Sequence, residues 1–476
     1  MMSSVLKALA VCLVFCYGVF TIAVYVVIAV FNGTFFRGPT EKERLELLLA
    51  KDRLWNLSKQ WSGLDHRFLT VSDGFKFHYV TNATPGSHAT HGSLVIFLHG
   101  FPDSWAIWRH ILASPLIRER STVVAVDLPG YGGSDGLEVY GASEVLEKLT
   151  EFIVGIREQY GVDISENNKP ARKVIIVGHD WGALLGFRLA SEAPQLANRF
   201  ILTNGPLFAL MRTNIALAVS SSAKMFKTFW RNPLHSHSIL FQSIIALRRV
   251  LRQLAMSGYI FAFQLPVPMV RYLGAGGNHS FLKFVHKQAA GAVGEYTIRD
   301  AEESMASTIG PGDEECQTVT SDGEQYPPSV AKRQKAGNFI DTVSYYRDGA
   351  ATRRWHKSLR TITALHGLSP GEPRRTSSGT GFFDPSAGTL KANATILWGA
   401  LDSALDSHLA LEGIADYLVR GSQVITLPKT GHFSPMEVEG RGALEKAVEW
   451  AIGDEKRDVR DVIAEVYPEA TVAVRK

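Results

Sequence analysis

The most informative stretch of the 476-residue chain is residues 173–182, Lys173-Val174-Ile175-Ile176-Val177-Gly178-His179-Asp180-Trp181-Gly182. Its first half is a short apolar run, as in a strand that is buried on both faces. Residues 183–192 then predict a helix, and the flanking Gly178 and Gly182 permit a tight turn between the two elements. Such a turn lifts Asp180 out at the carboxyl end of the strand. A simple helix cap is the competing interpretation, because Asp commonly caps helices.

Similar apolar runs recur along the chain and predict a mostly parallel sheet. They cover residues 94–98, 122–126, 395–398 and 423–427, with helical patterns between them. Strands alternating with helices indicate right-handed βαβ crossovers and therefore an α/β fold. Between residues 207 and 365 this pattern is replaced by an aromatic-rich, helix-like stretch. We expect this stretch to be a helical insertion that divides the sheet into two halves.

Two stretches have the composition of surface loops. Residues 307–337 are rich in Gly, Pro, Ser and charged residues, and residues 367–389 are rich in Gly, Pro, Ser and Thr. Both contain few aliphatic side chains with which to form a core, so we expect mobile or disordered insertions there.

Three further motifs follow predicted strands. Phe101 lies in His99-Gly100-Phe101-Pro102, after the run 94–98. Asp402 follows Trp398-Gly399-Ala400-Leu401, and His432 lies in Thr430-Gly431-His432-Phe433. Nucleophile, acid and histidine in this order match the catalytic triad order of hydrolases that place their nucleophile on a strand-to-helix elbow. Asp180 occupies the position that is serine in the usual G-x-S-x-G elbow.

These motifs resemble the α/β-hydrolase fold family and, within it, the epoxide hydrolase group. The most typical are His99-Gly100-Phe101-Pro102 and Gly178-His179-Asp180-Trp181-Gly182, and the resemblance covers residues 68–476 apart from the two predicted insertions. It implies an α/β-hydrolase core, a mostly parallel sheet flanked by helices, with residues 207–365 as an inserted helical cap. It also implies that the backbone N–H groups of Phe101 and Trp181 form an oxyanion hole.

An aspartate nucleophile points to a particular chemistry. Attack on an acyl group would give a labile anhydride, whereas attack on a saturated carbon that carries an oxygen leaving group gives a stable ester. The ester must then be hydrolysed by water, for which His432 is the expected base and Asp402 its supporting acid. Asp406, four residues further on, is the alternative acid.

An opening epoxide also needs a proton donor, which the resemblance assigns to cap tyrosines. Tyr346, in Ser344-Tyr345-Tyr346-Arg347, matches one of the two cap motifs. In the other motif Ala262 stands where a tyrosine is expected. Tyr259 lies three residues earlier, close to one helical turn, and is either a substitute donor or a core aromatic residue.

The sequence therefore predicts a hydrolase that opens a lipophilic epoxide to a vicinal diol through an aspartyl ester. A haloalkane dehalogenase-like hydrolase and a catalytically silent membrane protein of the same fold are the alternatives. No metal or organic cofactor is implied. With 50 basic and 46 acidic residues the formal net charge is +4, too small to predict nucleic-acid binding. The oligomeric state stays open.

The N-terminus has the composition of a membrane anchor. Residues 8–31 form 24 consecutive uncharged positions, enough to span a bilayer as a helix and too long for the apolar region of a cleaved signal peptide. Basic residues follow the segment, which favours a cytosol-facing catalytic domain on the endoplasmic reticulum. These are Arg37, Lys42, Arg44, Lys51 and Arg53. Glycosylation sequons point to the opposite orientation, at Asn32, Asn56, Asn82, Asn278 and Asn393.

The expected organisation follows from these segments. It comprises a membrane anchor (1–34), a juxtamembrane helical linker (35–66), the first half of the hydrolase core (67–206), the helical cap (207–365) and the second half of the core (366–476).

Overall fold

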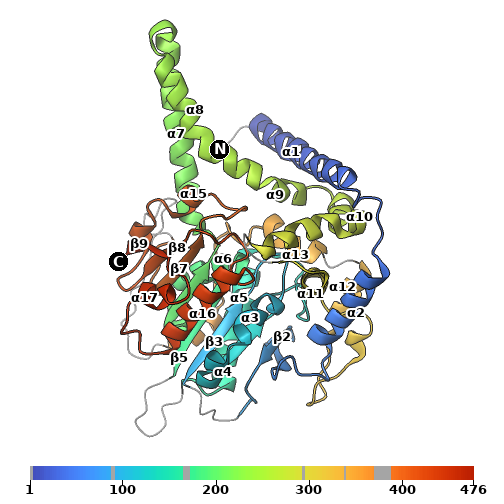
Figure 1. The fold of residues 1–476 in the computed structure, drawn as a ribbon. Helices are drawn as coiled ribbons and strands as arrows, with labels where there is room; N and C mark the ends of the chain where they lie inside the picture. Colours follow the sequence, from blue (N-terminus) through green and yellow to red (C-terminus); the bar gives the residue numbers. More distant parts are fainter. Residues whose placement is uncertain (1–3, 87–91, 164–171, 292–294, 337–338, 369–387) are drawn as a thin grey trace.

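A single twisted sheet forms the centre of the protein (Figure 1). The computed structural model describes residues 4–86, 92–163, 172–291, 295–336, 339–368 and 388–476, and these contain nine strands in the order β1-β2-β4-β3-β5-β6-β7-β8-β9. The strands are β1 (Asp65–Thr70), β2 (Lys76–Thr81), β3 (Ser93–Leu98), β4 (Ser121–Val126), β5 (Lys173–His179), β6 (Arg199–Thr203), β7 (Asn393–Gly399), β8 (Gln423–Leu427) and β9 (Thr471–Arg475).

The central strands are parallel and the outer ones antiparallel. Strands β4, β3, β5, β6, β7 and β8 pair in parallel, so their carboxyl ends meet at one edge of the sheet. Strands β1 and β2 extend one side of the sheet and β9 extends the other, all by antiparallel pairing. The expected α/β-hydrolase core, with a mostly parallel sheet, is confirmed.

Helices cover both faces of the sheet, as the alternation of side chains along β3 requires. Leu94, Ile96 and Leu98 belong to one buried cluster, and Val95 and Phe97 belong to the other. The first face is covered by α5 (Ala142–Gln159) and α6 (Trp181–Glu192). The second is covered by α3 (Arg109–Leu112), α4 (Pro115–Arg120), α16 (Val438–Ile452) and α17 (Val459–Ala464).

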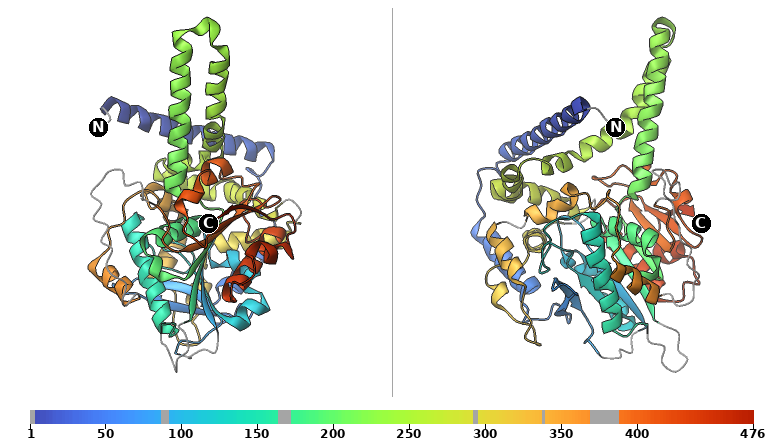
Figure 2. Two further views of the ribbon diagram at one scale, coloured as in Figure 1. Left: turned by 90° about the vertical axis from the view of Figure 1, so that its left-hand side faces the viewer. Right: turned by 180° about the vertical axis from the view of Figure 1, so that it is seen from behind.

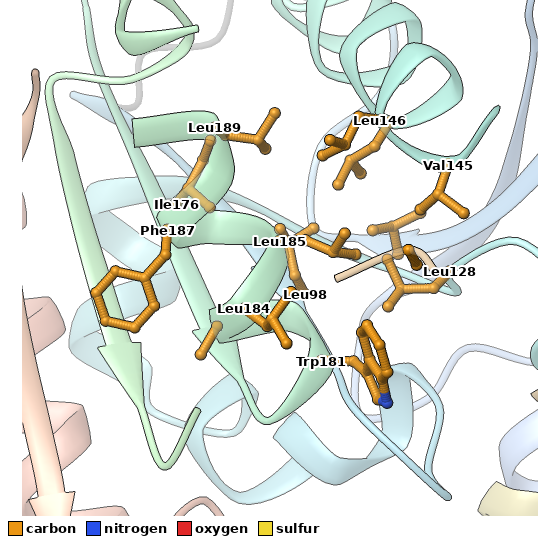
Figure 3. Close-up of a cluster of buried hydrophobic side chains, with 14 of the residues drawn as sticks. Leu98, Leu128, Val145, Leu146, Ile176, Trp181, Leu184, Leu185, Phe187 and Leu189 are labelled. Atoms are coloured by element: carbon orange, nitrogen blue, oxygen red, sulfur yellow. The ribbon is translucent and has the colours of Figure 1, made fainter. Parts of the chain in front are cut away.

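Helix α6 is held in place by buried side chains of β3 and α5. Figure 3 shows Leu184 and Leu185 of α6 beside Leu98 of β3, with Val145 and Leu146 of α5 on the other side. These side chains are all buried. Because α6 begins at Trp181, this packing also sets the position of the turn that precedes it.

The described residues between β6 and β7 are mostly helical, and their first part, residues 208–287, lies on the side of the carboxyl edge of the sheet (Figures 1 and 2). Helices α7 and α8 form a long antiparallel hairpin that extends away from the body, and α10 is kinked at residues 276–279. The helices are α7 (Phe208–Arg231), α8 (His237–Met256), α9 (Gly258–Phe263), α10 (Val267–Lys287), α11 (Ile298–Ile309), α12 (Pro328–Ala336), α13 (Phe339–Arg347) and α14 (Leu359–Gly367), while α15 (Ser407–Leu411) follows β7.

Two helices precede the sheet. Among the described residues, one helix is long and apolar enough to cross a membrane, the part of α1 (Ser4–Phe31) from Lys7 to Phe31. It packs on α9 so closely that a Cβ at Gly18 would lie 2.6 Å from the carbonyl oxygen of Phe261. Helix α2 (Glu41–Trp55) starts with a capping box between Thr40 and Glu43 and packs on α11.

The segment 307–336 differs from the expected mobile loop. It is packed against the core, with Tyr326 and Val330 buried and the Tyr326 hydroxyl donating to the carbonyl oxygen of Trp55 at 2.7 Å. A few buried side chains hold this otherwise polar segment on the core. The prediction of disorder was therefore wrong for these residues. Most of the second expected insertion, residues 369–387, lies outside the described residues.

Candidate active site

Asp180 lies on a sharp turn between β5 and α6. Its φ of 51° and ψ of −114° are unusual for a residue with a side chain. The turn is tight enough that a Cβ at Gly178 would lie 2.5 Å from the Gly182 carbonyl oxygen, and one at Gly182 would lie 2.0 Å from that of Leu98. Both positions therefore require glycine. The result is a strained backbone that directs the Asp180 side chain out of the carboxyl edge of the sheet.

The Asp180 carboxylate is held by the loop that follows β3. The backbone N–H of Phe101 donates to Oδ1 at 2.7 Å, and a Cβ at Gly100 would lie 2.3 Å from the same oxygen. Glycine at position 100 thus permits this close approach. The Leu184 N–H donates to the Asp180 carbonyl oxygen as the first bond of α6, which leaves the Trp181 N–H, at the first position of the helix, without a partner in the helical ladder.

His432 lies on the other side of the Asp180 carboxylate. Its Nε2 is 3.6 Å from Asp180 Oδ2, and its Nδ1 is 2.9 Å from Asp402 Oδ2. The bond to Asp402 assigns the proton to Nδ1 and leaves Nε2 facing Asp180. The structure thus brings together Asp180, His432 and Asp402 from the ends of β5, β8 and β7.

The charges of this group shift two pKa values. Burial alone would lower the pKa of His432, but the charges of Asp402 and Asp180 and its hydrogen bonds with them outweigh burial and raise the pKa to about 10. Burial would raise the pKa of Asp180, but the bond with His432 and its charge lower it. At neutral pH the free protein therefore holds an ionised Asp180 beside a protonated His432.

Asp406 does not contact His432. It caps α15, accepting from the N–H groups of His408 and Leu409 at 3.1 and 3.2 Å, and it pairs with Arg252 at 3.6 Å. Of the two acids that the sequence left open, the structure brings Asp402 to the histidine.

Three residues that the sequence analysis missed support the group. Asn204, after β6, donates from Nδ2 to Asp402 Oδ2 at 2.8 Å. His179 donates from Nε2 to the carbonyl oxygen of His432 at 2.8 Å, and Glu437 accepts from the Gly431 N–H at 2.7 Å. Burial raises the pKa of Glu437 to about 7. Asn204 could have been found, because it follows a parallel strand at the same sheet edge as Asp180 and Asp402.

The two cap tyrosines come from two different cap helices and line the same cavities as Asp180. Tyr259 on α9 and Tyr346 on α13 have ring centroids 6.0 Å apart, and Tyr346 packs edge-on against Trp181 at 4.9 Å. Burial and the charge of Asp180 raise the pKa of both hydroxyls, so both keep their protons at neutral pH. Ala262 is fully buried in α9.

Two cavities meet at this group. One, of about 440 Å³, is lined by Asp180, His432, both tyrosines and residues of α1 that include Tyr17 and Thr21. The other, of about 520 Å³, reaches the same Asp180 and tyrosines from the base of the α7–α8 hairpin and is lined mainly by apolar side chains. Both cavities have a size typical of small-molecule sites.

Within the part of the chain that the structure describes, there is no cluster of three or more His, Cys, Asp or Glu residues that could hold a metal ion.

Comparison with known proteins supports the fold and shows sequence similarity to proteins named as hydrolases. Residues 93–254 match the α/β hydrolase fold family. The chain is 31% identical over 159 residues to epoxide hydrolase 3 of Mus musculus, which covers 31% of this chain and 38% of that protein. It is 36% identical over 130 residues to epoxide hydrolase B of Mycobacterium tuberculosis, which covers 27% of this chain and 32% of that protein.

The matched segments thus span about a third of the length of these curated relatives. The Cif epoxide hydrolase from Acinetobacter nosocomialis is a solved structure with a TM-score of 0.50 and 16% identity, covering 87% of this chain and 96% of that one. This similarity concerns the fold alone. The chain is an α/β-hydrolase-fold protein, and its sequence is similar to the epoxide hydrolase group.

Proposed function

We propose that this protein is an epoxide hydrolase that converts a lipophilic epoxide to a vicinal diol. The observation that carries the proposal is that Asp180, on the elbow, lines a cavity with Tyr259 and Tyr346 and lies 3.6 Å from a histidine that is paired with Asp402. The sequence similarity to proteins named epoxide hydrolases supports the same reaction.

The first step opens the ring. A carboxylate oxygen of Asp180 attacks one epoxide carbon, and the bond from that carbon to the ring oxygen breaks. The ring oxygen takes the phenolic proton of Tyr346 or Tyr259, since both line the two cavities with Asp180. The products are a hydroxyalkyl ester on Asp180 and a tyrosinate.

The second step hydrolyses the ester. His432 takes a proton from water, and the hydroxide attacks the ester carbonyl carbon of Asp180. The oxyanion that forms is stabilised by the backbone N–H groups of Phe101 and Trp181. The intermediate collapses, the leaving alkoxide takes the proton of the newly formed carboxylic acid, and the diol departs. Asp180 is again a carboxylate and His432 is again protonated, as in the free protein.

Ester formation itself prepares His432 for this role. The pKa of His432 is high because Asp180 and Asp402 are both charged. Alkylation of Asp180 removes one of these charges, so the pKa of His432 falls and the imidazole passes its proton to the tyrosinate left by ring opening. The base is therefore released only after the ester exists.

Single turnover in heavy-oxygen water tests the proposal. The full-length protein, in excess over trans-stilbene oxide, reacts once, and the peptide that contains Asp180 is then weighed by mass spectrometry. We expect one heavy oxygen in the Asp180 carboxylate, because water attacks the ester carbonyl, and an unlabelled diol. Heavy oxygen in the diol with none in Asp180 contradicts the ester mechanism. Turnover of haloalkanes but not epoxides would favour a dehalogenase.

The α1 segment is proposed to hold the enzyme on a membrane as a single-pass anchor. Its 25-residue span from Lys7 to Phe31 carries few buried side chains, and basic residues follow it in the sequence. These features support a catalytic domain on the cytosolic face of the endoplasmic reticulum. A lipophilic epoxide concentrates in the same bilayer.

Removal of one cap hydroxyl is expected to slow ring opening without affecting ester hydrolysis. Tyr346→Phe should lower the rate of ester formation roughly 100-fold, and the double variant with Tyr259→Phe roughly 10⁴-fold, because general acid catalysis contributes amounts of this order. Rapid-quench single-turnover kinetics measures each step. Tyr345→Phe is the control, since its hydroxyl donates to the Pro129 carbonyl oxygen at 3.0 Å. Unchanged ester formation in the double variant would exclude both tyrosines as donors.

A further inference from the structure

The α7–α8 hairpin projects from the molecule and has no function in the reaction proposed above. Figures 1 and 2 show its outer half standing clear of the body, beyond the level of α1. Its two helices, Phe208–Arg231 and His237–Met256, are joined by a short turn. An isolated projection of this length needs an explanation, because it contributes little to the core of the fold.

The hairpin is built as a rigid element. Ser222 and Ser243 are buried between its helices, where their hydroxyls lie 2.9 Å apart and each bonds to the other's carbonyl oxygen at 3.0 Å. At its base, Asn214 donates to the Leu409 and Glu412 carbonyl oxygens, and Gln253 donates to that of Ala404. The hydrogen bonds at the base therefore hold the hairpin to the body, and the serine pair holds its two helices together further out.

Its outer surface is apolar and exposed. Trp230 is 65% exposed and Leu234, in the turn, is 79% exposed. Other large apolar side chains continue this surface on both helices, namely Leu217, Val219, Phe226, Phe241, Ile244, Ile245 and Leu251. Contiguous apolar surfaces of this kind mark sites of contact with a protein or a membrane.

The charge of the hairpin is of one sign. Residues 208–256 contain seven Lys and Arg and no Asp or Glu. Arg249 and Arg252, near the base, pair with Glu412 and Asp406 of the body. Within the described residues, the outer Lys224, Lys227 and Arg231 form no ion pair with a carboxylate. Basic side chains among exposed Trp, Phe and Leu are the composition of segments that bind anionic lipid surfaces.

The position of the hairpin agrees with a lipid partner. It lies on the same side of the molecule as α1, the one described helix that meets the criteria for a membrane span (Figure 2). The larger cavity begins at its base, where Met211, Ile215 and Val250 belong to the lining, and leads to Asp180. A bilayer around the hairpin would lie close to the mouth of this cavity.

We propose that the α7–α8 hairpin is a second membrane-docking element, whose apolar outer half enters an anionic bilayer surface independently of α1. Its basic side chains then meet lipid phosphates and carboxylates while Trp230 and Leu234 reach the acyl region. Docking places the cavity at the hairpin base against the bilayer. The docking does not depend on the chemistry proposed for Asp180.

Spin labels in the full chain test this docking. A nitroxide is attached at Leu234→Cys, or at the control Leu359→Cys, in a background of Cys12→Ser, Cys16→Ser and Cys316→Ser. Leu234 and Leu359 are equally exposed, at 79% and 80%, but Leu359 lies on α14, which packs on α5. The protein is reconstituted in phosphatidylcholine vesicles with and without phosphatidylserine, and accessibility of each label to oxygen and to a water-soluble nickel chelate is measured.

We expect the label at position 234 to be accessible to oxygen and shielded from nickel, and the label at 359 to be accessible to nickel. With phosphatidylserine present, Lys224→Gln, Lys227→Gln and Arg231→Gln together should lower the ratio of lipid-embedded to aqueous label by up to roughly 100-fold. A water-exposed label at 234 on vesicle-bound protein overturns the proposal. Dipolar broadening between labels, with no lipid contact, assigns the surface to a second copy of the chain and equally overturns it.

Discussion

Asp180→Asn is expected to abolish ester formation and to lower kcat by about 10⁴- to 10⁶-fold, the usual cost of removing a nucleophile. The amide keeps the size of the carboxylate and can still accept the Phe101 N–H bond, now 2.7 Å from Oδ1. It has no negative charge with which to attack a saturated carbon. Asp180→Ala should lower kcat by the same factor. A difference between the two variants would reveal an effect of the amide group itself.

The loss must be separated from unfolding. The positive φ of Asp180 costs stability in the folded state, whereas His432 stabilises its carboxylate there and lowers its pKa. We therefore expect Asp180→Asn to lose the stabilisation from His432 but to stay folded at the assay temperature, because Asn also tolerates a positive φ. Activity within tenfold of the wild type would exclude Asp180 as nucleophile, and a thermal midpoint below the assay temperature would assign the loss to folding.

The order of the polar groups along the sheet edge could be predicted from the sequence because it depends on local patterns. A buried apolar run, a tight turn and one polar residue recur after β5, β7 and β8, and parallel strands bring these turns to a common edge. The choice between Asp402 and Asp406 depended on the path of the chain after β7. The turn there directs Asp402 to His432, while Asp406 faces the start of α15.

Other features depend on contacts between distant segments and were not accessible. The packing of α1 on α9, and the presence of α1 side chains in a cavity with Asp180, join residues more than 150 positions apart. The polar composition of residues 307–336 suggested a loop, because composition averages over the few side chains, such as Tyr326, that hold the segment on the core. The hairpin was visible only as a helix-like, aromatic stretch, since sequence periodicity does not tell whether a helix faces a core or the outside.

The two carboxylates around His432 serve different steps, and electrostatics explains the division. Asp402 is fixed by Asn204 and by the N–H groups of Ala404 and Leu405, at 2.7 to 2.9 Å, so it stays in place beside His432 Nδ1. Asp180 loses its charge when it becomes an ester. Only this loss of the Asp180 charge can lower the pKa of His432 from its value near 10. His432 is thus expected to be needed for ester hydrolysis and dispensable for ester formation.

His432→Gln is accordingly expected to trap the ester. One equivalent of epoxide should be consumed and the mass of the intact protein should rise by the mass of the substrate, while steady-state turnover falls by about 10⁴-fold or more. The histidine also holds the pKa of Asp180 below its usual range, so its removal leaves burial as the main influence and raises that pKa. The rate of trapping should therefore increase with pH until Asp180 is ionised.

Two variants make the trapping result specific. His408→Gln removes an exposed histidine of α15 and should turn over normally with no adduct. The double variant Asp180→Asn with His432→Gln should neither turn over nor gain mass, because the residue that carries the ester is gone. An adduct in the double variant would move the nucleophile to another residue. Full turnover without an adduct in His432→Gln would mean that water is activated by another base, and Glu437, whose pKa is raised to about 7, is the nearest candidate in the same loop.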